Sequence, residues 1–255
     1  MPLEQSEALI LRSFDTGEQD KIVIFFTCEL GFLHGIAKGA RKFNNRFGST
    51  LEPFSHVQIF YYEKEHKDLV TLNNADLKES FFELLSDYQT ACNLSYLGEI
   101  TEEFFPQRHK EEVLFRLLLA TLKALKKGSD LNFTTAYFEA WLMKITGFCP
   151  DFSLCLKCRK RINGYSWLAR KKEGVYCALC APDKKTTVPS EILEFMSWIK
   201  INPPFSPTLP PLTSEQLTLI RKIFQDIIVF HLEKTPKTLH LIQLPENQSS
   251  FGKKD

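Results

Sequence analysis

Four cysteines in two closely spaced pairs constrain the fold of this chain more than any other feature. Cys155 and Cys158 form the first pair, and Cys177 and Cys180 form the second after an interval of 18 residues. Each Cys-x2-Cys turn can direct two sulfurs to one point, and this spacing is typical of a four-thiolate zinc site. A complete sulfur tetrahedron has no open position for water or substrate, so the one predicted Zn²⁺ ion is structural and not catalytic.

The segment around these cysteines, residues 151–182, is poor in large apolar residues. It therefore needs a cross-link, such as a bound metal ion, to fold. Two disulfides, or four unconnected thiols, are the alternatives. The N-terminus lacks the basic region and apolar core of a secretory signal, so we expect reduced cysteines. Cys28, Cys92 and Cys149 lie outside the cluster, and we expect them to be small, partly buried hydrophobes.

The first eighty residues are rich in short β patterns. We predict strands at 8–11, 21–27, 32–38, 56–62 and 68–77. Gly35 lies inside the third of these strands and indicates a bulge or a sharp bend. Five short strands in so short a segment favour a small barrel of the OB type.

From Phe81 onward, apolar residues recur at steps of three and four, which is the period of a helix. We predict helices at 81–106, 111–127, 133–145, 189–201 and 213–232, the last beginning with a capping box of Thr213 and Gln216. The predicted class is α+β and multidomain. It comprises an OB-type barrel (1–80), a helical domain (81–150), an inserted zinc segment (151–182), C-terminal helices packing on the helical domain (183–245) and a flexible tail (246–255).

The net charge of +1 hides a strongly uneven distribution. Residues 1–80 carry a net charge of −3, residues 81–150 carry −2, residues 151–190 carry +6 and the remainder is neutral. The run from Leu30 to Leu51 contains no acid, although it lies in the acidic first segment. A phosphate backbone responds to the field within about one Debye length, roughly 8–10 Å, so the whole-chain charge does not exclude a nucleic-acid ligand.

Several functional classes lack support in the sequence. The chain has no phosphate-binding loop, no HExxH, no GxSxG and no kinase motif, and its six histidines never pair at ligand spacing. We therefore predict that it is not an enzyme. No apolar run approaches the length of a membrane span, so we expect no membrane contact.

Several motifs in this order resemble the RecO family of bacterial recombination mediators. They are Glu7–Ser13, Gly17–Lys21, Ala37–Lys42, Arg46–Gly48 and Leu51–Phe54, followed by Trp141-Leu142 and Gly147–Pro150 ahead of the first cysteine pair. The resemblance covers roughly residues 1–235, and the block Lys38–Lys42 is its most specific part. Asn45 departs from the family pattern, in which a serine precedes the arginine.

The resemblance implies a DNA repair function and a set of partners. RecO-like proteins bind single- and double-stranded DNA and anneal complementary strands. They act with the ring-forming protein RecR, contact the acidic tail of the single-stranded DNA-binding protein SSB, and help to load the recombinase RecA onto SSB-coated strands. A cytoplasmic, nucleoid-associated location follows from these partners.

OB barrels hold single strands with cations along the backbone and exposed aromatic rings beneath the bases. We predict phosphate contacts from Lys38, Arg41, Lys42 and Arg46, with Arg12 and Lys21 as outer candidates. Phe43 and Phe47 either stack bases or anchor the loop in the barrel. The alternative function is a protein-interaction adaptor whose main ligands are proteins, and a zinc-dependent enzyme is a third, weaker class.

Overall fold

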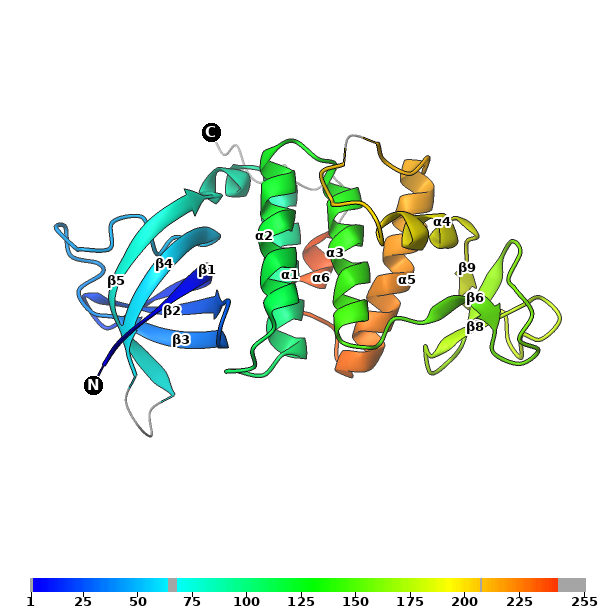
Figure 1. Ribbon diagram of the computed structural model, residues 1–255, viewed down its shortest axis with the longest axis horizontal. Coiled ribbons are helices and arrows are strands. Elements are labelled where there is room, and N and C mark those ends of the chain that lie inside the picture. Colours follow the sequence, from blue (N-terminus) through cyan, green and yellow to red (C-terminus); the bar gives the residue numbers. More distant parts are fainter. Residues whose placement is uncertain (1, 64–67, 207, 243–255) are drawn as a thin grey trace, which may run out of the picture.

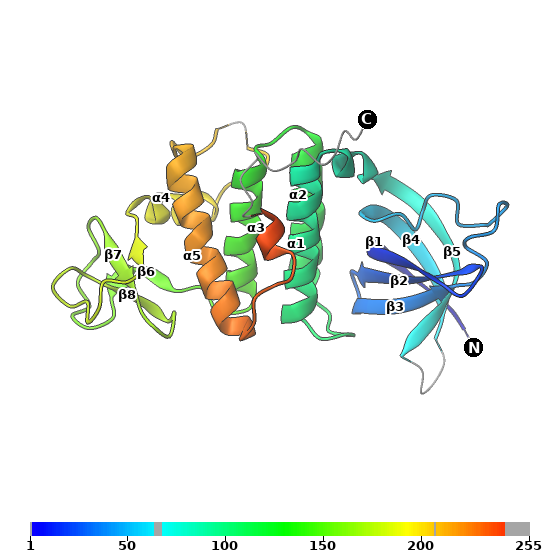
Figure 2. The ribbon, with the colours of Figure 1, turned by 180° about the vertical axis from the view of Figure 1, so that it is seen from behind.

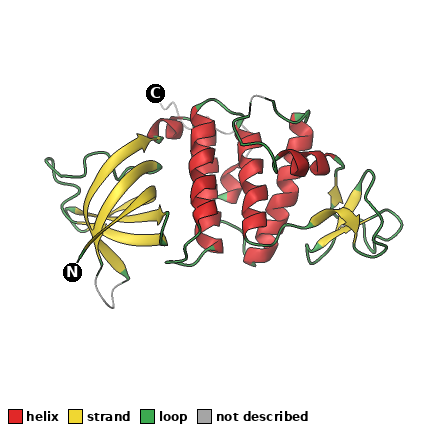
Figure 3. Ribbon diagram, viewed as in Figure 1, coloured by secondary structure: helices red, strands yellow, loops and turns green. Residues whose placement is uncertain are grey.

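The computed structural model describes residues 2–63, 68–206 and 208–242. Three parts follow one another along the long axis of the molecule: a β-barrel, a helical body and a small sheet that carries the four cysteines (Figures 1 and 3). The barrel and the small sheet lie at opposite ends, with the helical body between them. The predicted α+β class, with an OB-type barrel ahead of helices, is confirmed.

Five strands form the barrel: β1 (Leu3–Thr16), β2 (Asp20–Thr27), β3 (Gly31–Ala37), β4 (Ser55–Tyr62) and β5 (Leu69–Ser80). Their order around the closed barrel is β1-β2-β3-β5-β4, and β4 pairs with β1. All neighbours are antiparallel except β3 and β5, which pair in parallel from His34 opposite Leu69. Five strands closed in this way are an OB-type barrel.

The first three strands serve two hydrophobic cores at once. Ile10, Phe25 and Leu33 point into the barrel, whereas the residues next to two of them, Phe26 and Phe32, face outward and belong to the core of the helical body. Because both faces of these strands are buried, their sequences are continuously apolar instead of alternating. Packing of this strand surface on the helices therefore fixes the barrel against the body.

The helical body consists of the short 3-10 helix η1 (Phe82–Ser86) and the helices α1 (Tyr88–Phe104), α2 (Glu112–Lys126), α3 (Leu131–Ile145), α4 (Glu191–Trp198), α5 (Ser214–Leu232) and α6 (Leu239–Ile242). The predicted continuous helix from Phe81 is wrong at its start, because Asp87 is extended and its carboxylate accepts the N–H of Thr90 at 2.8 Å. A new helix begins there. The predicted capping box is confirmed, since Thr213 and Gln216 exchange both hydrogen bonds.

The chain leaves the helical body after α3 and returns to it with α4 and α5 (Figure 2). Helix α5 packs on α3, and α3 packs on α2 and α1. A buried ion pair joins two of them, with Arg221 Nε 3.6 Å from Glu139 Oε2. Among the described residues, no helix combines the length and the apolar character that crossing a membrane requires.

The excursion between α3 and α4 forms a four-stranded sheet of β6 (Asp151–Cys155), β7 (Ser166–Leu168), β8 (Gly174–Tyr176) and β9 (Thr187–Val188), in the order β6-β8-β7-β9. We call residues 151–188 the four-cysteine module. Strand β9 lies beyond the segment 151–182 that the sequence delimits. Phe152, Val175 and Val188 of the module are buried in the core of the helical body, so the module is attached through its apolar side.

Candidate metal centre and nucleic-acid interface

Two parallel strands bring the cysteine pairs together. Cys155 is the last residue of β6, and Cys177 directly follows β8, which pairs with β6 in parallel. The four sulfur atoms, one each from Cys155, Cys158, Cys177 and Cys180, all lie within 4.8 Å of one another, and Cys158 and Cys177 are 3.9 Å apart. A tetrahedral site with Zn–S bonds of about 2.3 Å requires sulfurs roughly 3.8 Å apart. The cluster therefore has the geometry to hold a metal ion.

The electrostatics of the cluster also favour a cation. Burial opposes ionisation of Cys155, yet the backbone N–H groups of Cys158, Cys177 and Lys157 lower its pKa to about 6. At the other extreme, a hydrogen bond with Cys177, burial and the other sulfurs raise the pKa of Cys180 to about 12. One thiolate is thus stabilised by amides, but all four cannot ionise together unless a positive ion offsets their mutual repulsion.

The three remaining cysteines lie apart from this cluster. Cys92 is buried, and Cys28 and Cys149 are half-buried, as expected for small hydrophobes. Burial raises the pKa of Cys149 to about 11, which keeps its thiol protonated and unreactive.

The basic segment of the barrel belongs to the loop of residues 38–54 between β3 and β4, which begins at the end of the barrel remote from the helices and returns toward them (Figure 1). Its last residues, Pro53 and Phe54, lie against the helical body. Phe47 and Leu51 anchor it, because both are buried in the barrel core. Asn45 shapes the turn by accepting the N–H groups of Phe47 and Gly48 at 2.9 Å. With 2% of its surface exposed, Phe47 serves as the anchor and has no face free for a base.

Three side chains of this loop are free. Lys38, Lys42 and Phe43 are exposed, and Phe43 is completely so. Within the described residues, neither lysine side chain forms a hydrogen bond or an ion pair. Proteins contact nucleic-acid strands through cations that follow the phosphates and through aromatic rings that stack on the bases. This loop presents both kinds of side chain.

The two arginines of the loop are partly engaged within the protein. Arg41 lies 3.2 Å from Asp15 and donates to the carbonyl oxygens of Gly17 and Glu18, so it ties the loop to the β1–β2 turn. Arg46 donates to the carbonyl of Leu72 at 3.2 Å and lies over the ring of Phe47. Each guanidinium has several donors, so these contacts orient the arginines without using all of their hydrogen bonds.

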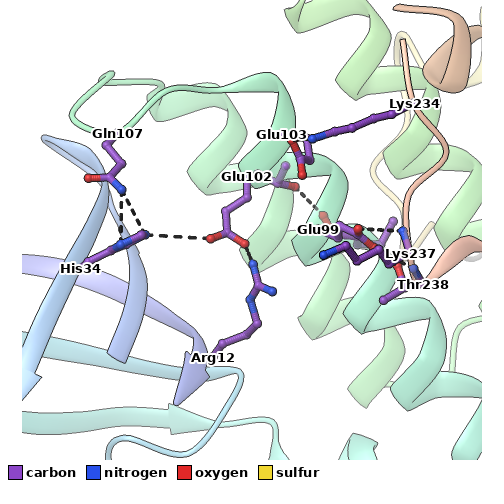
Figure 4. Close-up of polar contacts among 11 residues, drawn as sticks. Arg12, His34, Glu99, Glu102, Glu103, Gln107, Lys234, Lys237 and Thr238 are labelled. Atoms are coloured by element: carbon purple, nitrogen blue, oxygen red, sulfur yellow. Dashed lines mark hydrogen bonds and ion pairs between the residues drawn. The ribbon is translucent and has the colours of Figure 1, made fainter. Parts of the chain in front are cut away.

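The two outer candidates are neutralised by acids. Lys21 lies 3.6 Å from Glu52. Arg12 follows a bulge in β1 that sets it opposite Ile24, on the outward face, where it pairs with Glu102 of α1 (Figure 4). The phosphate contact of Arg12 stays a prediction, and in the structure Arg12 joins the barrel to the helical body. The sequence holds no signal for this role, because Glu102 lies far along the chain.

Comparisons with known proteins agree with this architecture. The model of the N-terminal part of recombination protein O matches residues 1–81, and that of its C-terminal part matches residues 85–240. The chain belongs to the RecO family. It is 34% identical over 176 residues to the DNA repair protein RecO of Koribacter versatilis, covering 69% of this chain and 72% of the relative. The RecO protein of Clostridium acetobutylicum is 27% identical over 248 residues, 96% of this chain and 98% of the relative.

The RecO family is one of DNA repair proteins, and in this member part of the usual OB binding surface is covered. OB barrels commonly bind strands across the face of the second and third strands. Here Phe26 on that face lies 6.3 Å from Phe115 of α2, ring centre to ring centre, and Phe32 packs beside it. The far end of this face, where Ile22 and Ile36 are half-buried, is more open. That end adjoins the β1–β2 turn and the basic loop.

Sequence reasoning missed the polar junction that holds the parts of this RecO-family chain together (Figure 4). Glu102 of α1 reaches Arg12 and lies 4.0 Å from His34 of the barrel. One turn earlier in α1, Glu99 accepts the N–H groups of Lys237 and Thr238 at 2.7 and 2.8 Å. Acids on an exposed helix face are common, so nothing in their spacing indicates these partners.

Proposed function

We propose that the chain is a recombination mediator in DNA repair that binds single- and double-stranded DNA without sequence preference and anneals complementary strands. The carrying observation is that the side chains of Lys38 and Lys42, at the start of the loop and close in sequence to the exposed ring of Phe43, form no hydrogen bond or ion pair with any residue that the structure describes. Cations in such a loop follow the phosphates, and the ring stacks on a base whatever its identity. Arg41 and Arg46 add phosphate contacts with the donors that their internal contacts leave free.

The phosphate contacts are tested by salt dependence. In the variant Lys38→Ala/Lys42→Ala, the slope of log K against log salt for single-stranded DNA should fall by about 1.4, because each lost contact accounts for about 0.7. The matched control is Lys21→Ala/Lys78→Ala, which removes two barrel lysines already paired with Glu52 and Glu7. The control should leave the slope nearly unchanged. Equal slopes for both variants and the unaltered protein would rule out this loop.

The stacking contact is tested separately with Phe43→Ala. Loss of one base–aromatic stack should weaken binding by about 1–3 kcal/mol at every salt concentration without changing the slope, because no charge is removed. Affinity for a homopolymer of thymidine, measured by fluorescence anisotropy, gives this value. An unchanged affinity would limit the site to phosphate contacts.

We further propose that Cys155, Cys158, Cys177 and Cys180 bind one structural Zn²⁺ and that the chain has no catalytic activity. The close approach of the four sulfurs supports this assignment. Metal analysis should give one zinc per chain, and X-ray absorption should give four sulfur neighbours. A shell containing oxygen, with an exchangeable water, would instead favour the zinc-enzyme alternative.

The partners that the family resemblance implies are a RecR-like ring protein, the acidic tail of SSB and, functionally, RecA, in the bacterial cytoplasm at the nucleoid. A groove of about 900 Å³ beside α5 suits an acidic, apolar-ended peptide, because Lys172 and Lys222 line it together with Val229 and Phe230. Capture of the SSB tail peptide should weaken in Lys222→Glu. Capture that persists in a chain with no affinity for DNA would favour the protein-interaction adaptor.

A further inference from the structure

A second group of free cations surrounds the first cysteine pair. The side chains of Lys157, Arg159, Lys160 and Arg161 are exposed, and none forms a hydrogen bond or an ion pair within the described part of the chain. Of the five other cations of the module, Arg170 lies 2.6 Å from Asp183, and Lys184 lies over the ring of Trp167. The turn of Lys157–Arg161 thus presents four exposed cations beside the sulfur cluster.

The backbone of the turn that carries these cations is held by hydrogen bonds. Arg159 donates its N–H to the carbonyl of Cys155 at 2.9 Å, and Cys155 donates to the carbonyl of Lys160 at 2.9 Å. A backbone bridge joins Arg161 to Leu154. The four side chains thus project from one hydrogen-bonded turn. Binding a ligand there costs the conformational entropy of the side chains but not that of the backbone, which is already ordered.

The module carries an excess of positive charge. Residues 151–190 carry nine basic and three acidic side chains, and one of those acids, Asp183, is already paired. Four thiolates with one divalent ion add about −2, so the module stays positive. Tyr165, 62% exposed and close in sequence to Arg161, offers an aromatic face in the same module. Cations interspersed with an open ring fit a nucleic-acid strand better than an apolar protein surface.

The two basic sites are far apart. The module and the β3–β4 loop lie at opposite ends of the molecule in both views (Figures 1 and 2). Between them lie successive layers of helices, α1 and α2, then α3, then α5. Helices pack about 8–10 Å apart, which makes the body at least roughly 20 Å thick. The Debye length is about 8 Å at physiological salt, so each site acts on its own ligand.

We propose that the turn of Lys157–Arg161 is a second DNA-backbone site, so that one chain holds two strand segments at once, one at each end. This inference rests on the proposed DNA-binding function of the barrel loop. Two strand segments held on one rigid body are brought together at an effective concentration set by that body, which raises the rate at which complementary strands meet.

The test counts bound oligonucleotides of about six nucleotides, near the low end of OB site sizes, by native mass spectrometry. The unaltered chain should bind two. The variant Lys157→Gln/Lys160→Gln/Arg161→Gln should bind one, and its zinc content should be unchanged. The matched control removes three body lysines, Lys110→Gln/Lys123→Gln/Lys200→Gln, and should bind two. An assay in which one immobilised strand captures a second, labelled strand should lose its signal in the module variant.

The barrel variant Lys38→Ala/Lys42→Ala separates this inference from the function on which it rests. It should also bind one oligonucleotide, and the combination of both variants should bind none. If the module variant still binds two while the barrel variant binds one, the second site is absent but the proposed function stands. If neither variant loses a strand, both proposals fail. If the module variant loses affinity only for polyglutamate, the turn binds an acidic protein, and our inference is wrong.

Discussion

The barrel loop and the cysteine turn both present free cations at an end of the molecule, but different forces hold them in place. The loop is anchored by Phe47 and Leu51 in a closed apolar barrel. The turn of Lys157–Arg161 is held around four sulfur atoms, in a sheet whose apolar residues belong to the core of the helical body. The comparison teaches that the first surface is held by packing and hydrogen bonds within the protein, whereas the second also depends on what binds the sulfurs.

The largest effect should follow removal of a sulfur. Cys177→Ser, or chelation of the metal, should open residues 151–188 and leave the barrel intact, because structural zinc contributes on the order of 10 kcal/mol to the folding of such modules. Hydrogen exchange read by mass spectrometry would show lost protection in the module only. Cys28→Ser, at a half-buried thiol outside the cluster, is the control. An equal loss of protection in the barrel would contradict the conclusion that different forces hold the two regions.

The anchor of the barrel loop should give the next largest effect. Phe47→Ala should lower the free energy of unfolding by about 3–5 kcal/mol, because it leaves a cavity where a buried ring lay. Phe43→Ala in the same loop should change it by less than about 0.5 kcal/mol, since that ring is fully exposed. Urea denaturation measures both values. Similar values for the two variants would mean that the loop is not held by packing.

Two glycines compare the packing of the regions directly. A Cβ on Gly35 would lie 2.8 Å from the side chain of Leu72 and 3.1 Å from Phe25, both completely buried. A Cβ on Gly174 would lie 2.8 Å from Leu156, which is half-buried beside a hollow and has room to move. Gly35→Ala should therefore lower the free energy of unfolding by about 1–3 kcal/mol, and Gly174→Ala should lower it by less. Thermal unfolding, followed by circular dichroism, measures both effects. Equal losses of stability in the two variants would contradict the conclusion that the module is less densely packed than the barrel.

The smallest effect concerns pH and the barrel. Burial lowers the pKa of His56 despite Glu7, whose Oε1 lies 2.6 Å away. Burial would raise the pKa of Glu7, but hydrogen bonds from His56 and Lys78 lower it. Both folded pKa values lie below the unfolded ones, about 6.5 and 4.3, so this stabilisation is complete above pH 6.5 and declines as the pH falls.

The variant His56→Gln should remove the loss of stability at the higher pH values, which is due to His56. The loss at the lower pH values, which is due to Glu7, should remain. The melting temperature measured from about pH 8 to pH 4 tests this, and a barrel that becomes more stable between pH 7 and pH 5 would contradict the assigned direction. A steeper loss in the module over the same range is expected, because protonated thiols release their metal.

Local patterns predicted much of this fold. The apolar run at Lys21–Thr27 and the spacing of the cysteines can each be read in a short stretch of sequence, although the contacts that they serve also involve distant residues. The start of α1 was missed because Asp87 lies in an otherwise helical apolar pattern, and only its extended backbone makes it a cap. Boundaries of this kind are decided by single hydrogen bonds, which periodicity does not report.

The candidate site was predictable in its residue types but not in their engagement. Lys38, Arg41, Lys42 and Arg46 are equivalent as sequence letters. Among the residues that the structure describes, however, Asp15 and the carbonyl of Leu72 hold the arginines, whereas the side chains of the two lysines have no partner. Phe43 and Phe47 likewise differ only in which of them points into the barrel. Partners such as Glu102 come from distant segments, so exposure and pairing require the tertiary structure.

The contact of Glu99 with Lys237 and Thr238 also sets an order for folding during synthesis. The last strand of the barrel ends at Ser80, so the barrel can close as soon as that residue has left the ribosome. Helix α1 follows at once, but Lys237 emerges 138 residues after Glu99. The outward face with Phe26 and Phe32 stays open to water until α2 supplies Phe115, and α3 waits longer for α5. A nascent chain of this kind carries the loop that we propose to bind DNA well before its body is complete.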